Sequence, residues 1–480
     1  MNDRKGFGSN FGFLMAAVGS AVGLGNIWGF PNKMGANGGF PFLILYLALA
    51  LCCGVIIMLG ELALGRKTGH GAVGAYQSIS KRFKWLGWLG IAAAALIFSF
   101  YSALGGYCLR YVVVNFGNLL GAEFGTNGVG GADVFQGLLS QPDVSIAFAL
   151  AFMLITMLVV MSGVGGGIER VCSVGMPALF FILIICIIRS CTLPGAADGL
   201  KYMFVPGWAV ANGIIDEAPG FWRVLTAAGG QMFFSLSLGA GVMITYGSYL
   251  DKKQDLGKST MIIVGMDTVV ALMAGLCVIP GRFALDPNGA LGGPELLFIT
   301  MQNVFDKMGP AGPVFGILFY LLVFFAAISS SISMLEVIVA HFCDKAREKG
   351  KGDRRKLYSA IAVVICAALC ALVCADGMGS NHISPAELLG LAGAKLPGWS
   401  TSWLGLFDSV AEGLLMPLGA LLMCLMISWE LKPDTLRQEI LLNGENRPWV
   451  YDFFRLCVKY ITPLCMLMIL YGQISDFFIV

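Results

Sequence analysis

Charged residues are scarce in this chain, at 12% of its 480 residues. Soluble domains usually carry about 25% Asp, Glu, Lys and Arg, so the composition excludes an ordinary water-soluble fold. The net charge of +2 gives no sign of a nucleic-acid partner, and we expect none. Apolar residues make up 57% of the chain and the mean hydropathy is +0.79, which predicts a membrane protein with many spans.

The residues of hydrolytic and metal chemistry are also few. Only three histidines are present, far apart in sequence, and no stretch resembles a Ser-His-Asp arrangement, a phosphate-binding loop or a zinc motif. The 14 cysteines are scattered, mostly through apolar segments. The helical series Cys366, Cys370 and Cys374 lacks a flanking histidine or carboxylate, which favours small core side chains over a soft-metal site. We therefore do not expect an enzyme.

Apolar runs of about 20 residues, the length needed to cross about 30 Å of hydrocarbon, recur along the whole chain. They predict eleven membrane spans, at about 11–34, 39–65, 86–117, 145–163, 168–190, 222–249, 259–281, 310–343, 356–375, 404–430 and 449–475. No connection is long enough for a separate catalytic or sensor domain. Residues 1–480 are therefore expected to form a single membrane domain, with short helices in the outer connection 282–309.

Basic residues are distributed unevenly between alternate connections. With the N-terminus in the cytoplasm, 21 of the 31 Lys and Arg residues lie on the cytoplasmic side and 8 on the other, while Arg455 and Lys459 lie in the last span. This distribution satisfies the positive-inside rule. We therefore expect a multi-pass protein of the cell membrane with a cytoplasmic N-terminus and, after eleven spans, an outer C-terminus.

The stretch GSAVGLGNIWGFP, residues 19–31, disrupts the first span. Glycine costs about 1 kcal/mol and proline about 3 kcal/mol in a helix interior, and irregular backbone in hydrocarbon survives only where it lines a site or is buried in protein. Residues 19–26 are therefore expected to unwind, as are 233–241 in the sixth span. Paired breaks five spans apart indicate a transporter site near the midplane. Packing through small residues explains the glycines but not Asn26 or the serines of the sixth span.

Further stretches follow in a distinctive order. They are NGG at 37–39, GELALGR at 60–66, QMFFSLSLGAGVMITYGSYL at 231–250 and FAAISSSISMLE at 325–336. Together with residues 19–31, and over essentially the whole chain, they resemble the neurotransmitter:sodium symporter family. The resemblance implies an all-α membrane fold with two inverted five-helix repeats, at about 11–190 and 222–430, and an extra helix at about 449–475. The first and sixth helices would be broken near the midplane.

The resemblance also implies two sodium sites built from oxygen ligands, which suit a hard cation. The first sodium would contact the substrate carboxylate and Ala21, Asn26, Ser235 and Asp267. The second sodium would contact Gly19, Val22, Ala326, Ser329 and Ser330.

An amino-acid substrate would lie between the two breaks. Its carboxylate would meet free N–H groups around Leu24 and Gly25. Relatives that carry amines without a carboxylate have Asp at the position of Gly23, and many relatives have a bulkier residue at the position of Ala240. The resemblance therefore implies a hydrophobic amino acid of the Leu, Met or aromatic type. The substrate-binding residues that it implies are Ala21, Gly23, Leu24, Gly25, Ile97, Tyr101, Phe234, Ser235, Ser237, Ala240, Ser330 and Met334.

Gating residues follow from the same resemblance. At the cytoplasmic end, Arg4 and Asp344 match a gating ion pair, with Tyr249 nearby. At the outer end, relatives usually carry Arg where this chain has Gly29, so we expect closure by apolar lids rather than by a charged clamp. The nearest lid candidates are Trp28, Phe234 and Tyr101.

Three other expectations concern the membrane interior. Asp267 stands where chloride-dependent relatives have Asn, and Ala271 where they have a hydroxyl residue, so chloride is not expected to be required. Glu61 is expected to bond unwound backbone amides. Gly167 and Pro177 frame a stretch of the fifth span whose unwinding would open a water path to the second sodium.

Three other functions stay open at this point. A proton-coupled amino-acid carrier of similar fold would not need sodium, and a non-transporting amino-acid sensor would bind without uptake. A channel suits two interrupted helices and an apolar pocket less well than an occluding carrier does. The oligomeric state and the identity of the amino acid are also open.

Overall fold

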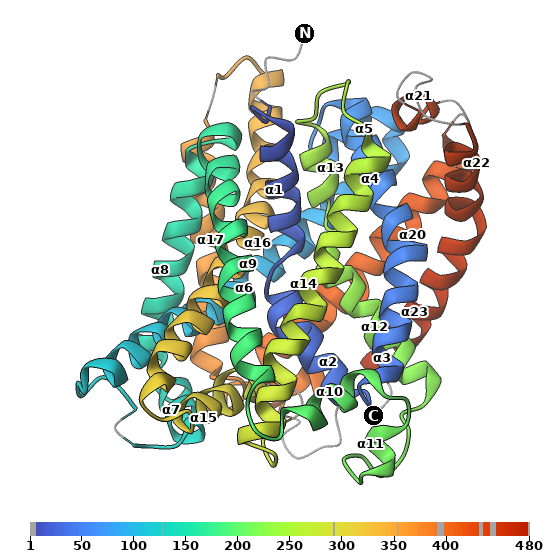
Figure 1. Ribbon diagram of the computed structural model, residues 1–480. Helices are drawn as coiled ribbons and strands as arrows, with labels where there is room; N and C mark the ends of the chain where they lie inside the picture. The colour runs from blue at the N-terminus through green and yellow to red at the C-terminus, as the bar shows by residue number, and fades with distance from the viewer. Residues whose placement is uncertain are drawn as a thin grey trace.

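The computed structural model describes residues 6–126, 128–290, 293–352, 354–390, 398–431, 435–441 and 448–478. The described chain is helical throughout, without β-strands (Figure 1). Within it, nine helical segments are long and apolar enough to cross a membrane, and residues 10–36 form a tenth, bent span. Residues 221–247 form the remaining one, which is interrupted. These are the eleven spans predicted from the sequence.

The spans are built from α-helices and from shorter π-helical segments labelled η. The first five are α1 (Asn10–Ala21) with η1 (Gly25–Gly29) and α2 (Phe30–Ala36), α3 (Phe40–Leu49) with η2 (Ala50–Gly54) and α4 (Val55–Thr68), α6 (Lys84–Leu120), α8 (Pro142–Met161), and η4 (Val164–Ile168) with α9 (Glu169–Cys191). The other six are α12 (Phe221–Leu236) with α13 (Val242–Gly247), α14 (Leu256–Leu285), α16 (Gly312–Glu348), α17 (Arg355–Asp376), α19 (Trp403–Asp408) with η8 (Ser409–Leu415), α20 (Met416–Leu425) and η9 (Met426–Glu430), and α22 (Pro448–Leu456) with η11 (Cys457–Ile461) and α23 (Thr462–Phe478).

Short helices occupy the connections. They are the α-helices α5 (Ala72–Ile79), α7 (Gly131–Leu139), α10 (Ala196–Phe204), α11 (Trp208–Ala211), α15 (Met301–Asp306), α18 (Pro385–Leu388) and α21 (Arg437–Ile440), the π-helix η5 (Leu296–Thr300), and the 3₁₀-helices η3 (Lys81–Phe83), η6 (Gly309–Ala311) and η7 (Gly398–Thr401). The pair η5 and α15 confirms the short helices expected within 282–309. The sequence analysis did not predict α5, which begins after Gly69 ends α4 with a left-handed φ of 67°.

The break in the first span is narrower than the predicted unwinding over residues 19–26. Helix α1 continues to Ala21, because the backbone N–H of Val22 still donates to Val18 O at 2.6 Å. Helical structure resumes at Gly25, and the two halves are bent by 44°.

The break in the sixth span covers residues 237–241, within the predicted 233–241. Ser237, Gly239 and Gly241 all have positive φ angles, of 53°, 80° and 74°. Glycine adopts this region without strain, whereas serine rarely does. The expected interruption of the sixth span is therefore confirmed.

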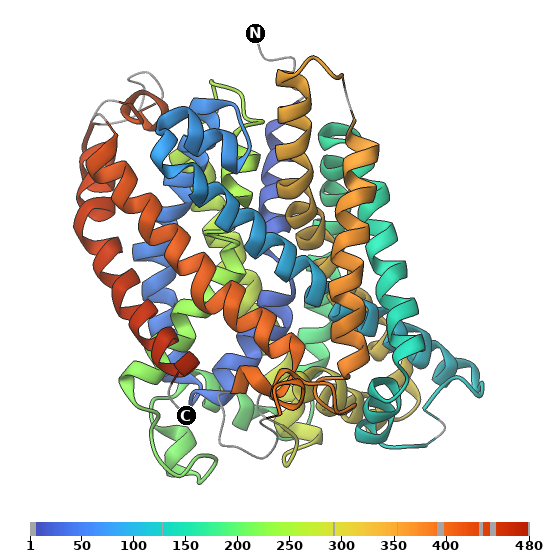
Figure 2. The same cartoon turned by 180° about the vertical axis from the view of Figure 1, so that it is seen from behind.

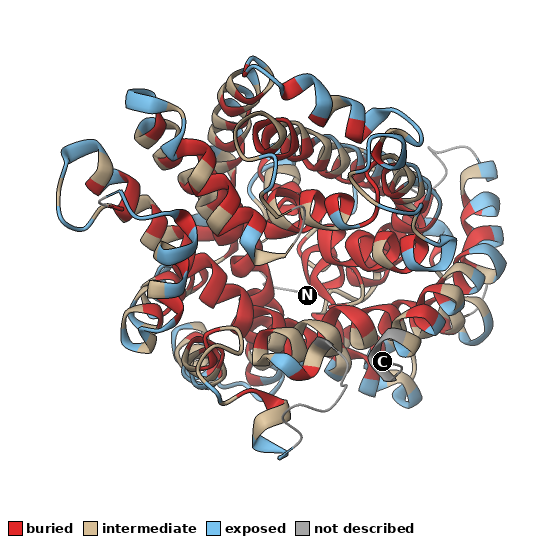
Figure 3. Ribbon diagram, turned by 90° about the horizontal axis from the view of Figure 1, so that it is seen from below, coloured by how far each residue is buried: buried red, intermediate tan, exposed pale blue. Residues whose placement is uncertain are grey.

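The two ends of the bundle differ in what they carry. The start of α1 lies at one end, here called the N-face, and the end of α23 lies at the opposite face (Figure 1). From behind, α6 and the segment 403–430 cross the bundle obliquely (Figure 2). Seen along the bundle, buried residues gather around its centre (Figure 3), and α16 packs against both α6 and α1. The broken spans are thus enclosed by protein.

Candidate functional site

The two breaks are joined to each other and to α6 and α16 by hydrogen bonds. The backbone N–H of Leu24 donates to the hydroxyl of Tyr101 on α6 at 2.7 Å. The carbonyl oxygen of Ser20, at the end of α1, accepts from Ser237 at 3.0 Å and from Ser330 on α16 at 3.1 Å. Unwound backbone therefore finds partners in neighbouring spans, as it must in hydrocarbon.

Gly23 has no room for a side chain. A Cβ atom at this position would lie 2.2 Å from Ser330 Oγ and 2.4 Å from the Tyr101 hydroxyl oxygen. At Gly25, a Cβ atom would lie 3.1 Å from the ring of Phe234. The ring centroids of Tyr101 and Phe234 are 6.3 Å apart. The break in the first span is therefore surrounded by one aromatic pair and one serine hydroxyl.

All twelve predicted substrate-binding residues are buried. Helical spacing places Ile97 one turn from Tyr101 and Met334 one turn from Ser330, so each apolar side chain shares a helix face with a polar one. The backbone of Ala240 packs against α6. The set therefore comes from four spans that meet at the centre of the bundle.

Three of the four predicted protein ligands of the first sodium lie together. The Asn26 amide nitrogen donates to Asp267 Oδ1 at 2.7 Å, and Ser235 Oγ lies 3.0 Å from both Asp267 carboxylate oxygens. Ala21, the fourth ligand, is the last residue of α1, beside the break. The hydroxyl of Tyr46 lies 3.2 Å from Asp267 Oδ2. Sequence reasoning missed Tyr46, whose only signal is a phenol within an apolar span.

Asp267 is a fully buried carboxylate, with 0% exposure. Within the described chain it forms no ion pair with Lys, Arg or His. Burying an unpaired charge is costly, so a carboxylate in this position must bind a proton or a cation or be held by hydrogen bonds. The oxygen donors around it suit a hard monovalent ion. The residues therefore fit a sodium ion.

The predicted ligands of the second sodium are also adjacent. Ser329 Oγ lies 3.0 Å from the carbonyl oxygen of Ala326 and 3.4 Å from that of Val22. Ser330 Oγ lies 3.4 Å from the carbonyl oxygen of Gly19. All of these candidate ligand atoms are uncharged oxygens. This set of dipoles suits a monovalent ion better than a divalent one, since it offers no charge to offset dehydration.

Two polar side chains support the breaks from outside the ligand sets. The Glu61 carboxylate on α4 accepts from the backbone N–H of Gly239 at 2.7 Å, as expected from the sequence. Gln231 on α12 donates from its amide nitrogen to the carbonyl oxygen of Gly25 at 2.6 Å. Glu61 thus satisfies an unwound backbone N–H of the sixth span, and Gln231 joins the sixth span to the start of η1.

The opposite face carries an ion pair beside the position at which apolar lids are expected. Lys33, one turn beyond Gly29, forms an ion pair with Glu412 on η8. Gly29 itself faces Gln231, whose Oε1 would lie 2.9 Å from a Cβ atom there. The expectation of apolar lids considered only the position of Gly29 and not the same helix face one turn later, and it stays a prediction.

A connection outside the helices also covers this face. The indole N–H of Trp28 donates to the carbonyl oxygen of Gly293 at 3.3 Å, and the N–H of Gly293 donates to Asn32 Oδ1 at 2.6 Å. Trp28 was predicted as a lid residue, and here its polar edge fixes a loop over α2.

At the N-face, Arg4 lies outside the described residues. Asp344, its predicted partner, accepts from the backbone N–H of Gly71 at 3.1 Å. The Tyr249 hydroxyl donates to Glu336 at 2.6 Å, and Arg355 donates to both carboxylate oxygens of Glu336, at 2.6 and 2.9 Å. Tyr249 therefore belongs to a second buried charge cluster that the sequence analysis did not identify.

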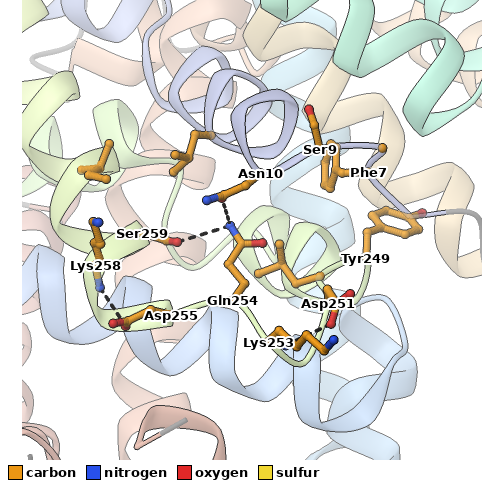
Figure 4. Close-up of a pocket in the computed structure, with 14 residues that line it drawn as sticks. Phe7, Ser9, Asn10, Tyr249, Asp251, Lys253, Gln254, Asp255, Lys258 and Ser259 are labelled. Atoms are coloured by element: carbon orange, nitrogen blue, oxygen red, sulfur yellow. Dashed lines mark hydrogen bonds between the residues drawn. The ribbon is translucent and has the colours of Figure 1, made fainter. Parts of the chain in front are cut away.

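A carboxylate of the fifth span contacts the start of the chain. Glu169 accepts from the backbone N–H of Gly8 at 2.7 Å and from the hydroxyl of Ser9 at 2.9 Å. Beside this segment lies a cavity of about 610 Å³, bounded by Phe7 and by the connection from Tyr249 to α14 (Figure 4). Two lining residues of this cavity are joined by a hydrogen bond, in which the amide nitrogen of Gln254 donates to Asn10 Oδ1 at 2.5 Å (Figure 4).

The fifth span is wound in this structure. Gly167 lies in η4 and Pro177 lies inside α9, so residues 164–191 are continuously helical. The predicted water path would require this segment to unwind in another state.

The chain is similar to known membrane transporters over almost its whole length. The model of the "Sodium:neurotransmitter symporter family" matches residues 4–134 and 127–478. A sodium-dependent transporter of Bacillus subtilis, YhdH, is 36% identical over 97% of both chains. A sodium-dependent transporter of Methanocaldococcus jannaschii, MJ1319, is 30% identical over 91% of this chain and 84% of that one.

A solved structure shares the fold. The crystal structure of MhsT in complex with L-phenylalanine matches with a TM-score of 0.83 at 33% identity, covering 98% of this chain and all of that chain. A more distant relative is the sodium-dependent nutrient amino acid transporter 1 of Drosophila ananassae, 26% identical over 72% of this chain and 63% of that protein.

Proposed function

The chain belongs to the sodium:neurotransmitter symporter family, and on that premise we propose that it takes up a hydrophobic α-amino acid together with two sodium ions by alternating access. That it is a sodium-dependent membrane transporter follows from the family. We propose, beyond the family, the substrate class, the number of ions and the residues that bind them.

The proposed carboxylate site rests on the crowding at Gly23. With Tyr101 and Ser330 so close, an acidic side chain at this position would displace both, and the backbone N–H groups of the break remain the donors available to a substrate carboxylate. Tyr101 already bonds the N–H of Leu24, so a bound carboxylate would share or replace that contact. Phenylalanine in the MhsT structure is consistent with an α-amino acid of this class.

The apolar part of the substrate would lie beside Ile97, Phe234 and Met334. Ala240 contributes little volume in the sixth-span break, which leaves space for a branched or aromatic side chain. We therefore propose Leu, Met and aromatic amino acids as substrates, ahead of small or charged ones.

The two sodium ions would occupy the two oxygen sets. The first set includes the substrate carboxylate and Asp267, and the second contains only neutral oxygens. Asp267 would supply the fixed negative charge that chloride supplies in chloride-dependent relatives, so chloride would not be required.

The N-face is proposed to be cytoplasmic, because the basic connections lie there. Phe7, Glu169 and the Glu336 cluster would then close the inner path, and Lys33 with Glu412 would close the outer one. Opening each end in turn would require these contacts to break alternately.

Uptake into proteoliposomes tests the proposal. Two sodium ions at 100 mV and a tenfold gradient supply about 7 kcal/mol, enough for about five decades of accumulation. We expect uptake of leucine, methionine or phenylalanine that requires sodium, with two ions per substrate. Uptake driven by a pH gradient without sodium would identify a proton-coupled carrier instead, and binding without uptake would identify a sensor.

A further inference from the structure

A groove of about 370 Å³ opens between α4, α14 and α22 in the half of the bundle near the N-face. Its walls are mostly apolar. They are formed by Val55, Ile56, Leu59, Met261, Val450, Phe453 and Phe454. This groove is separate from the substrate and sodium residues and none of them lines it.

The groove runs from the membrane surface toward the midplane. Val55 lies 13 residues before the end of α4 at Thr68, which corresponds to about 20 Å along the helix axis. At the other end of the groove are Lys258, in the first turn of α14, and Trp449, which is 60% exposed. Lysine and tryptophan are typical of the membrane interface, so the mouth lies at headgroup level.

One wall residue carries a hydroxyl without a partner. Thr260 is only 1% exposed, and its Oγ1 has no hydrogen-bond partner within the described chain. A helical threonine usually bonds back to a carbonyl one turn earlier, so this free hydroxyl is unusual. It needs an acceptor that the described protein does not supply.

The two charged side chains at the mouth differ in whether they already have a partner. The carboxylate of Asp255 accepts from the backbone N–H of Lys258 at 3.1 Å and so caps α14 (Figure 4). The ammonium of Lys258 forms no ion pair with a described carboxylate. Among the described residues, the mouth therefore offers an ammonium without an ion pair, beside the carboxylate that caps α14 and above a buried hydroxyl and an apolar channel.

We propose that this groove binds one phospholipid of the N-face leaflet. An acyl chain lies along the apolar walls, an ester carbonyl accepts from the Thr260 hydroxyl, and the phosphate pairs with Lys258. A phospholipid has an anion, an acceptor and a hydrocarbon chain in this order along its length, matching the groove from mouth to midplane. Under the proposed orientation this is the cytoplasmic leaflet, where lysine favours anionic headgroups.

The lipid site adjoins helices that reach the ion site. Thr260 lies seven residues, or two turns, before Asp267 on α14. Leu59 lies two residues before Glu61, which bonds the break in the sixth span. A bound lipid thus fills the space between the two helices that support the first sodium set.

Counting retained lipid by native mass spectrometry tests the site independently of transport. Protein reconstituted with phosphatidylglycerol and then transferred to detergent should retain one molecule per chain. Lys258→Gln and Thr260→Val should each lower retention about fivefold, by loss of one surface charge interaction or one hydrogen bond. Thr260→Val keeps the side-chain volume, and Lys253→Gln and Val269→Thr are matched controls outside the groove.

The controls should retain the lipid as the unchanged protein does. If both groove variants retain phosphatidylglycerol equally well, or if the unchanged protein retains only detergent, the proposal is wrong. Because this measurement does not involve substrate or sodium, its failure would leave the proposed transport function unaffected.

Discussion

The two proposed sodium sets both include residues of the broken first span, yet they differ in charge. The first contains the buried carboxylate of Asp267, and the second contains only carbonyl and hydroxyl oxygens. A fixed charge inside protein interacts strongly over several ångströms, whereas a neutral oxygen contributes a modest local dipole. Binding of the first ion is therefore expected to depend mainly on one residue, and binding of the second on the positions of several oxygens together.

Removing the charge of the first set should have the largest effect. Asp267→Asn removes the fixed charge of the protein beside the cation, leaving the substrate carboxylate as the remaining anion, and should weaken sodium-dependent uptake by about 3–5 kcal/mol, roughly a hundredfold or more. Sodium titration of uptake measures this, with Asp306→Asn in α15 as the matched control.

The dependence of uptake on chloride also tests the charge of the first set. Uptake by the unchanged protein should be equal in chloride and in gluconate, because Asp267 already supplies the negative charge. The variant Asp267→Asn with Ala271→Ser should recover uptake only in chloride. Full activity of Asp267→Asn in gluconate would contradict a charge-based first site.

The proposed substrate pocket includes Ala240, which belongs to neither sodium set, so a change there should affect the substrate before the ions. Ala240→Phe should weaken binding of leucine or phenylalanine by about 1–3 kcal/mol, with a smaller loss for alanine, because the ring fills space the larger substrates need. Competitive binding with each amino acid measures the loss. Equal losses for large and small substrates would place Ala240 outside the pocket.

Removing one ligand of the second set should have a smaller effect. Ser329→Ala deletes one of several neutral oxygens and should raise the sodium concentration for half-maximal uptake about fivefold, the equivalent of about 1 kcal/mol. Ser331→Ala is the control, since its hydroxyl bonds Ile328 and Thr156 instead. A hundredfold loss in Ser329→Ala would show that binding of the second sodium depends on a single residue as strongly as binding of the first does.

The smallest effect is expected for the charge at the opposite face, which belongs to neither set. The side chains of Lys33 and Glu412 are 24% and 8% exposed, so their ion pair is partly screened. Lys33→Met should change uptake by no more than about 1 kcal/mol and should abolish its dependence on ionic strength, adjusted with choline chloride.

Lys201→Met, on α10, is the control for lost charge at the same face. A Lys33→Met variant with unchanged salt dependence would mean that the ion pair takes no part in closing the path.

The sequence predicted features that local chemistry determines. The glycines and Asn26 of the first span and the serines of the sixth indicated the breaks, because each disfavours helix on its own. Features made by partners far apart in the chain were missed. Arg355 meets Glu336 across two spans, and Lys33 meets Glu412 after 379 residues. No single-helix pattern specifies which faces will meet.

The crowding at Gly23 also constrains how relatives of this chain can diverge. An evolutionary route from amino-acid to amine carriage that begins with an acidic residue at position 23 passes through an intermediate that collides with Ser330 and Tyr101. Sterics therefore favour one order of substitutions, in which Ser330 and Tyr101 make room while an amino acid is still carried and the new carboxylate is accepted afterwards.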